Sequence, residues 1–121
     1  MSYQQTTDER TILSSQAVTG AVSSESVDCS QYSEAEVYIS VSAKSGTSPT
    51  ADWDVQTSPD DSAWHQHGNI PQVNDPSVTT VYRHAVHHVT NLGKYLRVDL
   101  PSMGGSSTPS LTTEIKIILK T

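Results

Sequence analysis

Apolar and polar residues alternate along several stretches of the chain, most clearly over 35–44 (AEVYISVSAK). The apolar residues there occupy every second position: Val37, Ile39, Val41 and Ala43. Successive side chains of a β-strand point to opposite faces, so this pattern predicts a strand with one buried and one solvated face. Similar patterns predict strands over 11–18, 26–29, 78–89, 94–100 and 112–120.

The stretch 52–67 predicts a β-hairpin. In its first half Trp53 and Val55 alternate with acidic and polar residues, as expected of a strand with one wet face. The two halves are separated by Ser-Pro-Asp-Asp at 58–61, a combination typical of a type I turn.

Turn and breaker residues separate the other predicted strands. They predict loops over 45–49 and 68–77 and a flexible tip over 101–110. The alternation over 78–89 is imperfect, and we expect a bulge near Ala85. Seven or eight short strands without a persuasive helix or an internal repeat predict an all-β fold, a two-sheet antiparallel β-sandwich that is jelly-roll-like.

Length and charge narrow the class of protein. With 121 residues the chain has the size of one domain, and we expect a flexible N-terminal arm over 1–10 and a single β-sandwich domain over 11–121. A net charge of −6 with only seven Lys and Arg argues against nucleic-acid binding. No stretch approaches the roughly 18 apolar residues of a membrane span, and the polar N-terminus does not resemble a signal peptide. We therefore expect no membrane partner and synthesis in a cytoplasm without export.

Five His residues raise the question of a metal site. His65 and His67 are two apart on a predicted strand, which would place both imidazoles on one face as two metal ligands. A third ligand would come from one of three later residues: His84, His87 or His88. The alternative is that a core-facing Trp64 turns both imidazoles to solvent, or that the His side chains lie at a subunit contact. We favour this alternative and assign no metal.

Other candidate chemistry is weaker. Four Asp of the hairpin do not have the spacing of a calcium-binding loop: Asp52, Asp54, Asp60 and Asp61. The single Cys29 lies in a short, half-buried strand, where a thiol is usually inert packing. No Ser lies in a nucleophile-elbow motif. We therefore assign no catalytic residue and no cofactor, and we expect a protein that is not an enzyme.

Aromatic residues offer two kinds of binding surface. Trp53 and Trp64 could stack on sugar rings if they are exposed, whereas the alternative, which we favour, is that both indoles pack in the core. Tyrosine and arginine residues are enriched in protein interfaces. The candidates for such an interface are Tyr3, Arg10, Tyr38, Tyr82 and Arg83.

The last two-thirds of the chain resembles a group of small β-sandwich proteins of tailed-phage virions. Four segments carry the resemblance, and they follow one another in the same order as in that group. They are SPDDSAW at 58–64, GKYLRV at 93–98, GGSSTPS at 104–110 and the aliphatic strand at 115–119. The group prefers Gly where this chain has Asp61, but Asp tolerates the left-handed conformation better than most residues, so the turn can be retained.

This resemblance implies a structural part of a virion, because members of the group are head decoration or cement proteins, head fibres or tail modules. We expect a decoration protein, because a domain of 121 residues with a polar arm and no fibre repeat fits that role best. We expect it to form a homotrimer on the outer capsid surface. Its partner would be the major capsid protein. The alternative is a carbohydrate- or receptor-binding module displayed on the virion.

Overall fold

The computed structural model describes residues 6–70, 83–90 and 92–121. These residues form nine β-strands and contain no helix. The strands are β1 (Thr7–Val18), β2 (Val22–Ser23), β3 (Val27–Asp28), β4 (Glu34–Ala51), β5 (Trp53–Ser58), β6 (His65–Ile70), β7 (Arg83–Thr90), β8 (Tyr95–Leu100) and β9 (Met103–Lys120).

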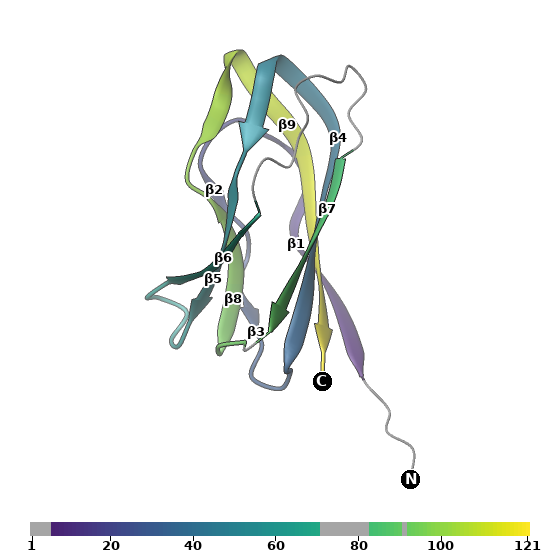
Figure 1. Cartoon of the computed structure of the whole chain (residues 1–121), viewed down its shortest axis with the longest axis vertical. Helices are drawn as coiled ribbons and strands as arrows, with labels where there is room; N and C mark the ends of the chain where they lie inside the picture. The colour runs from purple at the N-terminus through teal and green to yellow at the C-terminus, as the bar shows by residue number, and fades with distance from the viewer. Residues whose placement is uncertain (1–5, 71–82, 91) are drawn as a thin grey trace.

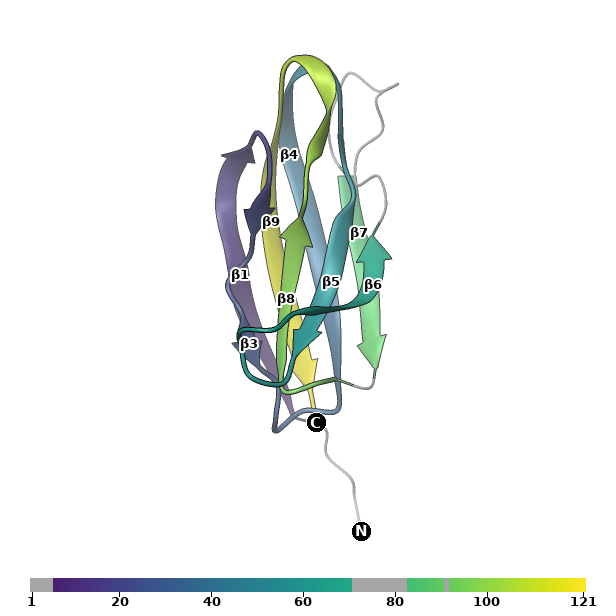
Figure 2. The same cartoon turned by 90° about the vertical axis from the view of Figure 1, so that its left-hand side faces the viewer.

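The strands build two antiparallel sheets that pack face to face (Figure 1). One sheet has the order β1-β9-β4-β7, and the other has the order β2-β8-β5-β6, with β3 also paired to β8. The pairs are nested, since β1 pairs with β9, β2 and β3 with β8, β4 with β7, and β5 with β6. Such nested pairing arises when one long hairpin with eight strand positions folds over into two sheets. This arrangement is the jelly roll. The predicted jelly-roll-like sandwich is confirmed; β2 and β3 share one position, so nine strands fill eight places (Figure 2).

The inward side chains of both sheets form one core. Its central members are at most 1% exposed: Val37, Ile39, Ile115, Ile117 and Leu119 from the four-stranded sheet, and Trp53, Val55, Leu96, Val98 and Leu100 from the five-stranded sheet. Full burial of one such aliphatic side chain contributes about 1.5–3 kcal/mol. This apolar layer, and not the polar outer faces, therefore holds the two sheets together.

The strands extend beyond their predicted bounds at four places. Residues 68–70, expected as the start of a loop over 68–77, form the end of β6, and residues 71–77 lie outside the described residues. Residues 7–10, expected in the N-terminal arm, begin β1, and residues 1–5 lie outside the described residues. Residues 45–49, expected as a loop, belong to β4, and most of the expected tip over 101–110 belongs to β9.

The added parts of β4 and β9 pair with each other as a ribbon, from Ser45 opposite Ser110 to Ala51 opposite Met103. The breaker residues produce irregularities within this ribbon and do not end it, because the register shifts at several points and Gly46 adopts a φ of 82°. A Cβ at Gly46 would lie 2.7 Å from Cα of Pro109, so this position requires glycine for space as well as for conformation.

Two smaller expectations were wrong. Ala43 is exposed and does not continue the buried row, because the β4–β9 register shifts between Val41 and Ala43. The expected bulge near Ala85 is not present, since β7 pairs with β4 without a register shift and Ala85 lies opposite Ile39.

The turn of the β5–β6 hairpin lies where the sequence predicts it. Asp61 adopts a φ of 60°, the left-handed conformation that Asp tolerates. Oδ1 of Asp60 accepts hydrogen bonds from the backbone N–H groups of Ser62 at 3.0 Å and Ala63 at 2.9 Å. These backbone bonds, that from Ala63 above all, lower the pKa of Asp60. The carboxylate therefore builds the turn that leads into β6.

Candidate functional site

The outer face of β1-β9-β4-β7, which we call the four-strand face, has a partly apolar centre. Tyr38 of β4 and Ile118 of β9 are half-buried there and line a shallow hollow of about 340 Å³. Polar residues of three strands complete its lining: Glu9, Ser40, Glu114 and Lys116. An aliphatic and an aromatic side chain within a polar rim is the composition typical of a protein contact surface.

Several charged side chains on the four-strand face form ion pairs. Nζ of Lys120 donates to Oε1 of Glu36, and the hydroxyl of Tyr38 donates to Oε2 of the same carboxylate. The bond from Lys120, followed by that from Tyr38, lowers the pKa of Glu36, and the carboxylate in turn raises the pKa of Lys120 and of Tyr38. Lys116 lies 3.6 Å from Glu9 in a second pair. The apolar centre is therefore flanked by charges that already satisfy one another.

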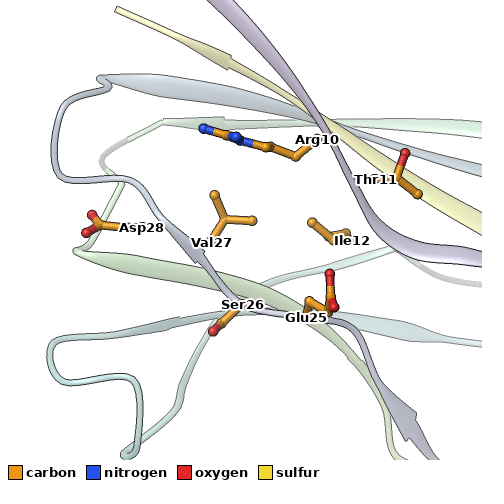
Figure 3. A pocket seen from close by; sticks show the side chains of 7 residues that line it. All are labelled: Arg10, Thr11, Ile12, Glu25, Ser26, Val27 and Asp28. Carbon is orange, nitrogen blue, oxygen red and sulfur yellow. The ribbon is translucent and has the colours of Figure 1, made fainter.

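A seam separates the edge strand β1 from the edge segment that carries β2 and β3. A hollow of about 300 Å³ opens there, with Ile12 and Val27 pointing into it and Arg10 and Asp28 beside it (Figure 3). The backbone N–H of Glu25 donates to the carbonyl of Ile12 at 2.8 Å and ties the two edges together.

The charges at the seam are also engaged. Arg10 lies 2.7 Å from Oδ2 of Asp8, and that oxygen also accepts a hydrogen bond from the hydroxyl of Tyr32 at 3.0 Å. Hydrogen bonds from Ser30 lower the pKa of Asp28 and keep it ionised. The seam offers a mixed polar and apolar contact surface.

The outer face of the other sheet, the five-strand face, is built from planar polar side chains. Gln56 of β5 lies opposite both Gln66 of β6 and Arg97 of β8. Nε of Arg97 donates to Oε1 of Gln56 at 2.8 Å, and Nε2 of Gln66 donates to Oδ1 of Asp54 at 3.4 Å. The guanidinium carbon of Arg97 lies 4.4 Å from the ring centre of Trp64, a cation–π distance.

The two Trp residues have different places. Trp53 is 1% exposed and belongs to the core, so it cannot stack on a sugar, and that part of the predicted glycan contact is wrong. Trp64 is half-buried and lies against Arg97 on the five-strand face, so the expectation that it points into the core is also wrong. The register shift between Val55 and Gln56 in the β5–β6 pairing is the irregularity that the alternation pattern did not reveal.

The predicted protein interface is described only in part. Tyr38 is at the centre of the four-strand face, and Arg10 is at the seam. Tyr3 and Tyr82 lie outside the described residues, as does the side chain of Arg83. The two described candidates, Tyr38 and Arg10, lie on different surfaces.

The His residues occupy different surroundings. Nε2 of His67 lies 2.8 Å from the carbonyl oxygen of Thr90 and connects β6 to β7, while His65 is exposed. Nε2 of His88 lies 3.3 Å from Oε2 of Glu34 on the four-strand face. The side chains of His84 and His87 are outside the described part. Within the described residues, no three His, Cys, Asp or Glu side chains gather in the manner of a metal site.

Cys29 is 1% exposed, and burial raises its pKa to about 11. Its thiol is therefore protonated near neutral pH, as expected of a packing residue. In the ranges that the structure covers, no helix has the length and apolar character needed to cross a membrane.

Sequence pattern alone missed Gln56, Gln66, Arg97 and Ile118 as members of possible contact surfaces. Alternation places Arg97 and Gln56 on outward positions, but their contact joins residues 41 positions apart. The cross-strand register that brings them together is not visible in the local pattern.

No family model and no curated protein matches the chain. Among solved structures, the chain is similar to the SPBc2 prophage-derived protein YomS, with a TM-score of 0.56 and 12% sequence identity. The match covers 100% of this chain and 98% of that protein. At this identity the similarity establishes a shared fold.

Proposed function

We propose that the chain is a non-enzymatic structural protein of a tailed-phage virion, a decoration or cement protein. It binds the outer surface of the head, contacts the major capsid protein and stabilises the coat lattice. It is made in the host cytoplasm and acts as a homotrimer.

The observation that carries this proposal is the end-to-end similarity of fold to a prophage-derived protein. Because the match spans nearly the whole of both chains, a protein described as prophage-derived has the same fold from end to end. The order of the segments SPDDSAW, GKYLRV and GGSSTPS, which resembles that of small virion proteins, supports the same origin. Fold alone does not define a function, so the proposal also depends on a surface that could contact the coat.

The four-strand face is our candidate for the surface that meets the coat. Its centre, Tyr38 and Ile118, can bury apolar area against a partner, and the pairs Lys120–Glu36 and Lys116–Glu9 form a polar rim that tolerates partial desolvation. Glu114 has no ion-pair partner among the described contacts, which favours a basic residue on the coat.

Several copies of a modest contact are enough for stable attachment. A trimer held over coat subunits at fixed spacing turns the second and third contacts into intramolecular events, so the total affinity exceeds that of one contact by orders of magnitude, roughly 10²–10⁴. Such a clamp joins neighbouring coat subunits and opposes their separation.

The test is sedimentation of the purified protein with expanded shells of the same phage that lack it. We expect saturable co-sedimentation, and we expect Tyr38→Asp to reduce it strongly. The matched control is Trp64→Ala, an aromatic change on the opposite face that should leave binding unchanged. A protein that stays in the supernatant at every salt concentration contradicts the proposal.

A further inference from the structure

We propose that the five-strand face is a binding site for neutral oligosaccharides of pyranose sugars. The proposal goes beyond attachment to a shell and does not depend on it, since the site lies on the opposite side of the sandwich from the four-strand face.

The first support is the arrangement of the polar groups. Gln66, Gln56 and Arg97 lie in one row across β6, β5 and β8. The neighbouring row along the strands contains Asp54 opposite Asp99, two positions from Gln56 and Arg97 and therefore on the same face. The result is a flat array of amides, carboxylates and a guanidinium on adjacent strands.

This set of groups matches the hydrogen-bonding needs of a sugar. Each sugar hydroxyl can donate one hydrogen bond and accept two, so it is best held between a donor and an acceptor of fixed geometry. Carboxylates accept, guanidinium groups donate, and amides do both. In the described contacts Arg97 uses only Nε and Gln56 only Oε1, so both Nη groups of Arg97 and the amide nitrogen of Gln56 remain available to a ligand.

Trp64 supplies the apolar part of the site. One side of a pyranose ring presents C–H groups, which pack against aromatic rings, and an indole offers a large surface for this contact. Trp64 is half-buried and not enclosed in the core, and the guanidinium carbon of Arg97 lies 4.4 Å from its ring centre, which places the ring beside the polar array. The turn anchored by Asp60, whose carboxylate binds the N–H of Ala63 at 2.9 Å, fixes the backbone just before Trp64.

The charges select neutral ligands. Asp54 and Asp99 stand against the single positive charge of Arg97, and that charge is already shared with Gln56 and the Trp64 ring. An acidic sugar or a phosphate would meet two carboxylates, and like charges in close contact disfavour binding. Because strands and cross-strand hydrogen bonds hold the array before the ligand arrives, little ordering entropy is lost on binding.

The test is a titration of the purified protein with hexasaccharides of glucose, mannose, galactose and N-acetylglucosamine. Binding is measured by calorimetry and by tryptophan fluorescence. Hexagalacturonate serves as the acidic probe. We expect at least one neutral hexasaccharide to bind with a dissociation constant of about 1 mM or tighter. We expect Trp64→Ala to weaken that binding by about tenfold or more.

The matched control is Tyr38→Ala, which removes a half-buried aromatic ring from the four-strand face and should leave sugar binding unchanged. Melting curves show whether each variant is folded, and Trp64→Phe, which keeps a ring at the position, should retain part of the affinity if Trp64→Ala fails to fold. The inference is overturned if no neutral hexasaccharide binds, if hexagalacturonate binds better than all of them, or if Tyr38→Ala weakens binding as much as Trp64→Ala. None of these results affects the sedimentation test of the shell contact.

Discussion

The two outer faces of the sandwich are made by the same strand periodicity, yet their polar groups are organised differently. On the four-strand face, Lys120 forms an ion pair with Glu36, and the apolar centre of the face lies at Ile118. On the five-strand face, Arg97 and Gln56 join each other by one bond and keep other donors available in the described contacts. Charged pairs around an apolar centre suit contact with another protein. Planar amide and guanidinium groups with further donors available suit hydrogen bonding to a small polar ligand. The same strand periodicity can thus prepare two sheets for different tasks.

The largest effect expected from this comparison is that of Ile118→Asp on shell binding. The change places a carboxylate at the apolar centre, on the strand position opposite both Glu9 and Glu36. We expect each contact to weaken by about tenfold, and a trimer with three contacts to lose roughly a thousandfold in total. Sedimentation with shells over a range of protein concentrations measures the loss.

Ile118→Val is the control for that experiment, because it keeps a branched apolar side chain and should retain most of the affinity. Sugar binding should be unchanged in both variants. If Ile118→Asp is folded and decorates shells as well as the parent does, the four-strand face is not the contact surface.

The next largest effect is that of salt concentration, which should weaken shell binding more than sugar binding. The screening length falls from about 10 Å at 0.1 M to about 3 Å at 1 M salt, so contacts steered by charges such as Glu114 and Lys116 should weaken by about tenfold over this range. Binding of a neutral hexasaccharide should change by less than about twofold over the same range. Parallel sedimentation and calorimetry series check this, and equal salt dependence of both activities would remove the distinction.

Arg97→Lys should have a smaller, selective effect. Lysine keeps the charge but loses the planar group that lies over Trp64 and bonds Gln56. We expect neutral-sugar affinity to fall by about three- to fivefold and shell binding to stay unchanged. Calorimetry measures the first and sedimentation the second; full sugar affinity in the Lys variant would show that the guanidinium has no role in the site.

The smallest expected effect is the response of the four-strand face to acid. Since hydrogen bonds from Lys120 and then Tyr38 lower the pKa of Glu36, its ionised form stabilises the fold above its ordinary pKa of 4.5. That stabilisation is lost as the pH falls from 4.5 through the lowered pKa of the folded state. The melting temperature of Glu36→Gln should therefore fall less steeply with acid than that of the parent, while Gln66→Ala on the other face should follow the parent. Identical acid profiles for Glu36→Gln and the parent would contradict the role of this pair.

Local periodicity was enough to predict the sandwich but not the length of its strands. The row Val37, Ile39 and Val41 was correctly expected to be buried, because alternation directly encodes the face of a strand. The ribbon between β4 and β9 was not expected, since Gly46 and Gly105 are ordinary loop signals. In the structure Gly46 and Gly105 have positive φ values of 82° and 115° within irregular pairing. Ser107 and Thr108 also have positive φ values, of 58° and 55°.

The surfaces were predictable only where one strand defines them. Tyr38 was expected on an outer face and lies there, but its partner Glu36 is held by Lys120, 84 positions away in the chain. Trp64 could not be placed, because the irregular β5–β6 pairing and the distant Arg97 determine where its ring lies. Contacts of this kind depend on register between remote strands, which no local pattern contains.

The most direct test of the account is a cryo-electron microscopy map of shells saturated with the protein, at a resolution that separates the two sheets. The account predicts β1, β9 and β4 against the coat, with Ile118 at the contact and the row Gln66, Gln56 and Arg97 facing outward. A map with β6, β5 and β8 pressed against the coat, or shells that bind no protein at saturating concentration, would contradict it.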